Sequence, residues 1–135
     1  MRVSGGSQVD AMYTHLGFYQ SASGEVEIIG EGSTWTTDFA FNVGWAGEGD
    51  LEIRNGGRVE SAAGRIAGHA DGAGHARAIG ESSAWHASEL DVGGDSGGAG
   101  GEGTLTLLGL GSLLPLACRR KVYRNRPVII AREPT

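Results

Sequence analysis

The sequence predicts an all-β protein, a parallel β-solenoid (β-helix) of about four turns. Three observations support this fold class: a high glycine content, a repeat of about fifty residues that divides in half, and an alternation of polar and apolar residues within each half. Glycine accounts for 25 of the 135 residues, proline for three, and 39% of the residues are apolar. These values fit neither collagen nor a disordered linker, so many turns joined by short strands are expected.

The repeat is clearest in two segments fifty residues apart. Residues 24–35, GEVEIIGEGSTW, return as residues 74–85, GHARAIGESSAW, and the turn SGG at 4–6 returns as NGG at 55–57. Gly56 and Gly57 suit a corner because glycine tolerates positive φ. Trp35 and Trp85 occupy equivalent positions, and we expect them to be structural stacking partners between turns of the solenoid.

Each repeat divides again into strand-and-corner halves. The pattern glycine, polar, apolar, polar, apolar begins at residues 24, 49, 74 and 103, at spacings of 25, 25 and 29. Period-two alternation predicts strands with one buried face, and a second series of short strands ends near residues 16, 43, 66 and 92. We therefore expect two or three strands of three to five residues in each turn, with a loop insertion over 93–102. The predicted core contains Leu51, Ile53, Val59, Ile66, Ile79, Leu90 and Val92.

Independent antiparallel hairpins are the alternative architecture, since hairpins also alternate. They give no reason for a period of twenty-five residues, whereas stacked turns at about 4.8 Å do. The solenoid is therefore the preferred interpretation for residues 1–107.

Charge separates the chain into two regions. Residues 1–117 contain five arginines and no lysine against fifteen acidic residues, a net charge of −10, whereas residues 118–135 have a net charge of +5. An acidic body with dispersed arginines argues against nucleic acid as a partner. Cys118 is the only cysteine, so no internal disulfide can form.

An uncharged stretch, residues 104–117, precedes Arg119, Arg120 and Lys121. As a helix, the thirteen residues 105–117 would reach about 20 Å, too short for a hydrocarbon core of about 30 Å. Residues 104–113 also align without gaps on residues 50–59, so the apolar segment and basic cluster at 108–121 are either a sorting-signal-like element or a terminal turn. Residues 122–135 are expected to be a flexible tail.

Few residues suggest a reaction or a bound ion. His69, Asp71 and His75 share a glycine-rich loop, but solvated histidines are commoner than such a metal site, and the calcium-turn-like segment at 97–102 occurs once. Asp50, Glu52, Arg54 and Arg58 project outward, where polar residues are expected simply because they contact water. We predict no cofactor, no metal and no enzyme activity.

The repeat resembles that of bacterial autotransporter passengers and PEP-CTERM surface proteins. The family pattern of Gly-Thr-Leu-Thr-Ile, an Asn-Gly-Gly turn and Gly-Ser-x-Trp is matched by GDLEIRNGG at 49–57 and GSTW at 32–35. Ser82 and Ala67 replace expected glycines, which suggests relaxed packing. The apolar segment with Arg119, Arg120 and Lys121 resembles the PEP-CTERM sorting signal recognised by an exosortase, with Gly-Glu-Gly at 101–103 where the family has Pro-Glu-Pro.

The resemblance implies a non-catalytic structural or adhesin-like module of a Gram-negative cell-surface or secreted protein. The alternative is a carbohydrate-binding or carbohydrate-cleaving β-helix, in which Trp45 would contact sugar. Expected partners are cell-envelope glycans, other solenoid ends and an exosortase. The start at Met1 shows no secretion signal and falls within a repeat, so we expect the chain to be part of a longer precursor.

Overall fold

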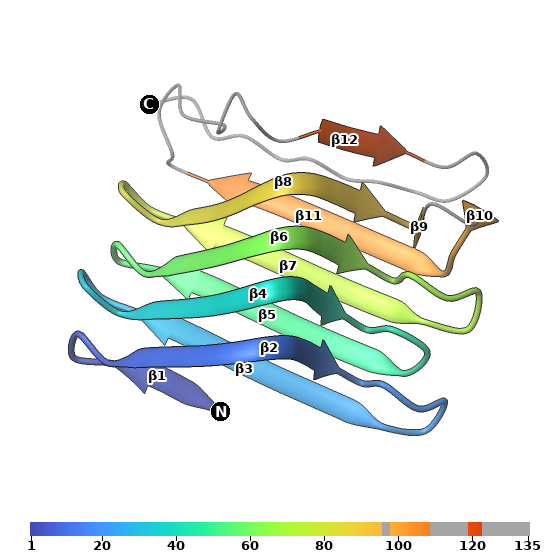
Figure 1. Cartoon of the computed structure of the whole chain (residues 1–135), viewed down its shortest axis with the longest axis horizontal. Coiled ribbons are helices and arrows are strands. Elements are labelled where there is room, and N and C mark those ends of the chain that lie inside the picture. The colour runs from blue at the N-terminus through green and yellow to red at the C-terminus, as the bar shows by residue number, and fades with distance from the viewer. Residues whose placement is uncertain (96–97, 109–118, 123–135) are drawn as a thin grey trace.

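The computed structural model describes residues 1–95, 98–108 and 119–122, which form a parallel β-solenoid of about four turns (Figure 1). Two five-stranded parallel sheets face each other, and the chain passes from one to the other at every corner. Within these described residues, no helix is of a length and hydropathy that would let it cross a membrane. The predicted fold class is confirmed.

Sheet A has the order β1-β3-β5-β7-β11 and sheet B the order β12-β8-β6-β4-β2. The strands of sheet A are β1 (Arg2–Ser4), β3 (Ser23–Ile29), β5 (Glu48–Arg54), β7 (Ala73–Ile79) and β11 (Glu102–Leu108). Those of sheet B are β2 (Gln8–Leu16), β4 (Thr34–Val43), β6 (Arg58–Ile66), β8 (Ala84–Val92) and β12 (Arg119–Val122). In the predicted insertion, β9 (Gly94–Asp95) and β10 (Gly98–Ala99) form an antiparallel pair.

The spacing of the repeats along the chain matches the pairing register of the strands in sheet A. Gly24 pairs with Gly49, Gly49 with Gly74 and Gly74 with Gly103, so each step of 25, 25 and 29 residues advances the chain by one turn. The expectation of strands of three to five residues was wrong, because the strands of the complete turns contain 7 to 10. A cross-section with two long sides and tight corners accommodates twenty-five residues without a third side.

The core lies between the two sheets and is filled by the inward residues of each alternating strand. Of the seven predicted core residues, six are at most 6% exposed: Leu51, Ile53, Val59, Ile66, Leu90 and Val92. Ile79 is only half-buried and corrects the prediction. Ala76 and Ala78 point inward, so Ile79, the residue after them, must face outward. Arg54 and Ile29, at the same register position in β5 and β3, also face outward.

Sheet B turns toward sheet A at corners with left-handed backbone. The corner residues after β2, β4, β6 and β8 have positive φ, of 64°, 69°, 56° and 74° at Gly17, Gly44, Ala67 and Gly93. A Cβ on Gly44 would overlap the carbonyl oxygen of Ala73, in the next turn of the solenoid. Ala67 keeps the corner conformation and is fully buried, and Ser82 also has a positive φ of 65°. The alanine and the exposed serine thus both adopt a backbone conformation that favours glycine, so the corners keep their shape at the two substituted positions.

The two repeat-equivalent tryptophans do not stack directly on each other. Trp35 and Trp85 are buried, but they lie two turns apart, with Val59 between them in the register of sheet B. Phe41 connects them through edge-to-face contacts, with ring centroids 5.6 Å from Trp35 and 5.5 Å from Trp85. Gly64 lies beside Phe41 in the adjacent strand, where an added Cβ would come within 2.7 Å of the Trp85 ring. The two tryptophans are therefore not stacking partners of each other; both are core residues that contact Phe41.

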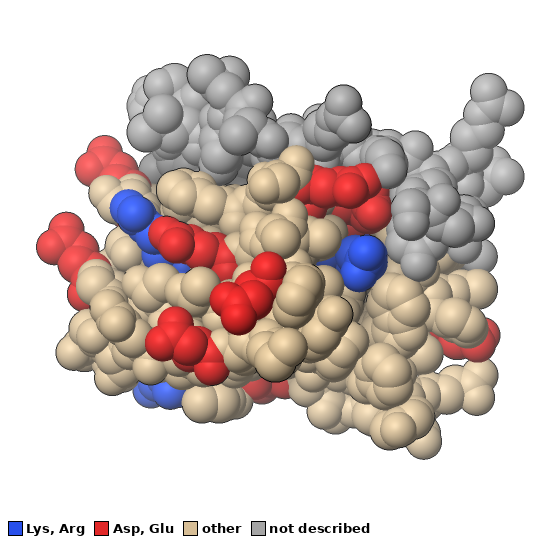
Figure 2. Space-filling view, in the orientation of Figure 1, with Lys and Arg blue, Asp and Glu red and all other residues tan. Residues whose placement is uncertain are grey.

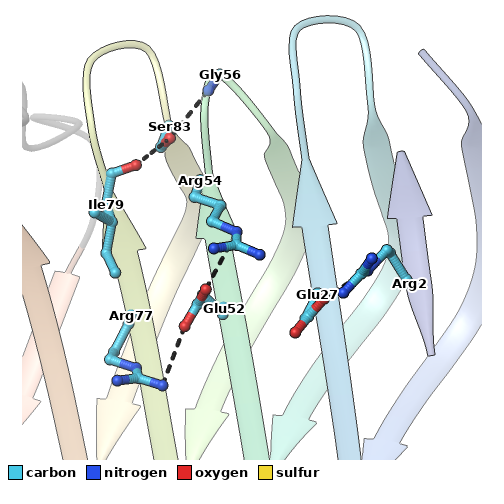
Figure 3. Close-up of polar contacts among 8 residues, drawn as sticks. All are labelled: Arg2, Glu27, Glu52, Arg54, Gly56, Arg77, Ile79 and Ser83. Carbon is cyan, nitrogen blue, oxygen red and sulfur yellow. Dashed lines mark hydrogen bonds and ion pairs between the residues drawn. The ribbon is translucent and has the colours of Figure 1, made fainter. Parts of the chain in front are cut away.

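Buried polar groups of the corners and of the core are bonded between neighbouring turns. Gly56 N–H donates to Ser83 Oγ at 3.1 Å, and the equivalent Gly6 N–H donates to Ser33 Oγ at the same distance (Figure 3 shows the first pair). Inside the core, the Trp85 indole N–H donates to Ser61 Oγ at 3.0 Å. These bonds satisfy groups that would otherwise be costly to bury.

The outer face of sheet A carries ion pairs between turns. Glu52 contacts Arg77 of the next turn at 3.1 Å and Arg54 of its own strand at 3.3 Å (Figure 3). Arg2 Nε donates to Glu27 at 2.7 Å, and this hydrogen bond lowers the pKa of Glu27. The outward charges thus contact one another along the stack.

The C-terminal segment is described only in part. Residues 102–108 form β11, which adds to sheet A, and Arg119, Arg120 and Lys121 lie in β12, which pairs in parallel with β8. The rest of the predicted apolar segment, 109–118, and residues 123–135 of the predicted tail lie outside the described residues.

Candidate functional site

A groove on the outer face of sheet B, toward the ends of β2 and β4, combines aromatic and polar side chains. Its volume is about 410 Å³, within the range of small-molecule sites. We call it the aromatic groove; its lining residues are Tyr13, His15, Phe18, Ala40, Asn42, Trp45 and Arg65.

The stacking of turns brings these residues together. His15, Asn42 and Arg65 are direct register partners in β2, β4 and β6, and Tyr13 and Ala40 are partners two positions earlier. All of them alternate with core positions and therefore point outward. Phe18 and Trp45 follow the left-handed glycines Gly17 and Gly44, so two successive corners supply the remaining rings.

Next to the groove lies an exposed aromatic patch: Tyr13, Phe18, Tyr19 and Phe39, which are 55%, 40%, 73% and 48% exposed. The Tyr13 ring stacks on Phe39 with centroids 5.0 Å apart, and Phe18 meets Tyr19 edge-to-face at the same separation. His15 links the two pairs, since it lies 4.7 Å from Phe18 and is stacked with Tyr13. Figure 2 shows a surface with few charges at the lower right, where Figure 1 places the corner after β2.

Hydrogen bonding in the groove is incomplete. Asn42 is 2% exposed, and its Nδ2 lies 3.0 Å from His15 Nδ1. Within the described part of the chain, Asn42 Oδ1 and Arg65 Nε are buried without a hydrogen-bond partner. Burial, and then the positive charge of Arg65, lower the pKa of His15, so its imidazole is neutral at pH 7. The neutral ring can donate one hydrogen bond and accept another.

Trp45 rests on a glycine of the following turn. A Cβ on Gly68 would come within 2.6 Å of the Trp45 ring, so the absence of a side chain there makes room for the indole. Trp45 is half-buried and lines the groove, in contrast to the buried Trp35 and Trp85. It is therefore the tryptophan that the structure leaves accessible.

A second, polar groove of about 480 Å³ crosses β4, β6 and β8 on the same sheet. Glu60 and His86 are register partners in its wall, and hydroxyl groups of Ser61 and Thr37 also line it. No ion pair joins Glu60 to His86 among the described residues, so this surface shows no assembled acid–base pair.

The other residues considered from the sequence serve the fold or remain apart. Gly56 has φ 86°, and Gly57 lies against the carbonyl of Ile28, as a corner requires. Asp50 and Arg58 are exposed, while Glu52 and Arg54 pair with each other. His69 Nδ1 lies 3.6 Å from Asp71 Oδ2. Across the described residues, no three His, Cys, Asp or Glu side chains, His75 included, form a group suited to a metal ion.

Sequence reasoning singled out Trp45 but missed Tyr13, Phe18 and Phe39. The sequence signal that could have revealed Tyr13 is the residue type at equivalent positions of the repeat. In the next two turns these positions are occupied by alanines, Ala40 and Ala63. An exposed ring at a position whose equivalents are alanines is unexplained by core packing.

Comparison of the chain with protein-family models, curated proteins and solved structures finds no match in any of the three.

Proposed function

We propose that this chain is a non-catalytic, adhesin-like repeat module of a bacterial cell-surface or secreted protein. The observation that carries the proposal is that the two outer faces of the solenoid differ in their side chains. On sheet A, Glu52 and Arg77 connect neighbouring turns, whereas sheet B presents the exposed aromatic patch beside a groove. A rigid stack with one adhesive face is suited to contact at an envelope.

Resemblance of the repeats and of the C-terminal segment to PEP-CTERM and autotransporter proteins supports the surface location. In that proposal, Arg119, Arg120 and Lys121 form the basic end of the sorting element that an exosortase recognises. The acidic body projects away from the membrane, in keeping with the positive-inside tendency.

The location is tested on intact cells of the organism that encodes the chain. An antiserum against the purified protein should label unpermeabilised cells, and external protease should remove the label while a cytosolic marker survives. Label that appears only after permeabilisation would refute the surface assignment. Whether the C-terminal segment is processed is read from the mass of the extracted protein.

A further inference from the structure

We propose that the aromatic groove binds a neutral glycan, with Tyr13, Phe18 and Trp45 contacting pyranose carbons and Asn42, His15 and Arg65 bonding hydroxyl groups. The proposal deepens, and rests on, the adhesin-like function, because it names the ligand class of the contact surface.

The aromatic side chains form a pre-arranged wall. The Tyr13 ring is nearly parallel to those of Phe39 and His15, at interplanar angles of 16° and 9°, and Phe18 contacts His15 and Tyr19 edge-to-face. Rings that already contact one another lose less conformational entropy when a ligand binds than isolated side chains do. Their exposed carbons offer apolar surface to the C–H groups of a sugar ring.

The polar groups supply the complementary half of a sugar site. Asn42 Oδ1 is a buried acceptor without a partner in the described chain, and native structures rarely leave such an atom unpaired. Asn42 lines the groove, and a sugar hydroxyl that entered beside it would donate to this oxygen. The neutral His15 imidazole and the Arg65 guanidinium add donors along the same row. Mixed aromatic and amide surfaces suit a ligand that alternates apolar and hydroxyl faces.

Charge favours a neutral ligand over an acidic one. Arg65 is the only cation among the lining residues, and its register partner in β8 is Asp91, an acidic residue. The full chain also carries a net charge of −5, which disfavours polyanions. A polyuronate would have to overcome this field for a single arginine contact.

The test titrates the purified full chain with cellohexaose, maltohexaose and mannohexaose, and with polygalacturonate as the acidic probe. Because Trp35 and Trp85 are buried, a change in tryptophan fluorescence reports mainly on Trp45. Saturation-transfer NMR identifies the bound sugar protons. We expect at least one neutral oligosaccharide to bind and polygalacturonate to bind more weakly.

Matched variants locate the site. Tyr13→Ala and Trp45→Ala should each weaken binding by about tenfold or more, as expected for aromatic anchors of a binding site. Met12→Ala is the control, because Met12 is 62% exposed on β2 but does not line the groove. Its affinity should change by less than about twofold. Circular dichroism checks that every variant is folded, and Trp45→Phe should retain most of the affinity.

Three results would overturn the proposal: no binding of any neutral oligosaccharide, tighter binding of polygalacturonate, or equal losses in Tyr13→Ala and Met12→Ala. Self-association that Tyr13→Ala abolishes, in the absence of sugar binding, would assign the groove to a second copy of the chain. None of these results depends on cell-surface labelling, so failure of the glycan proposal is distinguishable from failure of the surface location.

Discussion

Replacing Phe41 by alanine should be among the most damaging single changes in this solenoid. The ring is 0% exposed and lies in the second turn, where it contacts both buried tryptophans edge-to-face. Gly64, its register neighbour in β6, has no side chain that could move into the space. The cavity would therefore collapse poorly, and poor collapse is the condition under which large-to-small substitutions cost most.

The expected loss is about 4 kcal/mol, within the range of about 3–5 kcal/mol found for buried Phe→Ala changes. Of this total, the two ring contacts account for about 0.5–1.5 kcal/mol each. Phe41→Leu is the control, because it preserves most of the volume but removes the aromatic edges. It should lose about 2 kcal/mol, more than a simple volume-conserving exchange because both tryptophan contacts disappear.

Urea unfolding followed by far-UV circular dichroism measures both variants, and tryptophan fluorescence followed in parallel tests for a single transition. A loss below about 1.5 kcal/mol for Phe41→Ala would refute the argument that Phe41 joins the tryptophans, because the turns would then be packing independently. A double-mutant cycle with Trp85→Leu should show coupling of about 0.5–1.5 kcal/mol.

Three further outcomes are expected. Gly44→Ala should destabilise the protein by at least about 2 kcal/mol, because the added Cβ would overlap the backbone of Ala73. Ala67→Gly should stay within about 1 kcal/mol of wild type, because relief of backbone strain offsets the loss of a buried methyl group. Chemical denaturation measures both variants. Glu52→Gln should cost no more than about 1 kcal/mol, and the difference from wild type should shrink in high salt, since its arginine partners are partly exposed. Because the pKa of His15 is lowered in the folded state, protonation of His15 favours the unfolded state, and stability should fall as the pH drops below the ordinary imidazole value of about 6.5. A His15→Gln variant should lose less stability over the same pH range. A pH profile identical to that of the wild type would contradict the assignment.

The sequence alone was sufficient to predict the solenoid. A period of twenty-five residues and the alternation of polar and apolar residues indicate which backbone segments pair and which side chains face inward, because a strand has only two faces. The glycines after Leu16, Val43 and Val92 could be read as corners for the same reason, since few other residues adopt positive φ. The same alternation places Ile79 outward, because it follows the inward Ala78, so its assignment to the core was wrong.

The cross-section and the candidate site required the tertiary structure. Alternation does not say whether a turn has two long sides or three short ones, because that choice depends on how opposite side chains fill the interior. The contact of Phe41 with both tryptophans depends on Gly64 in another turn, and the groove joins residues from three strands and two corners. Tyr13, Asn42 and Arg65 are tens of residues apart in sequence. Only the stacking register brings them together, and outward positions carry no packing constraint from which their shared site could have been predicted.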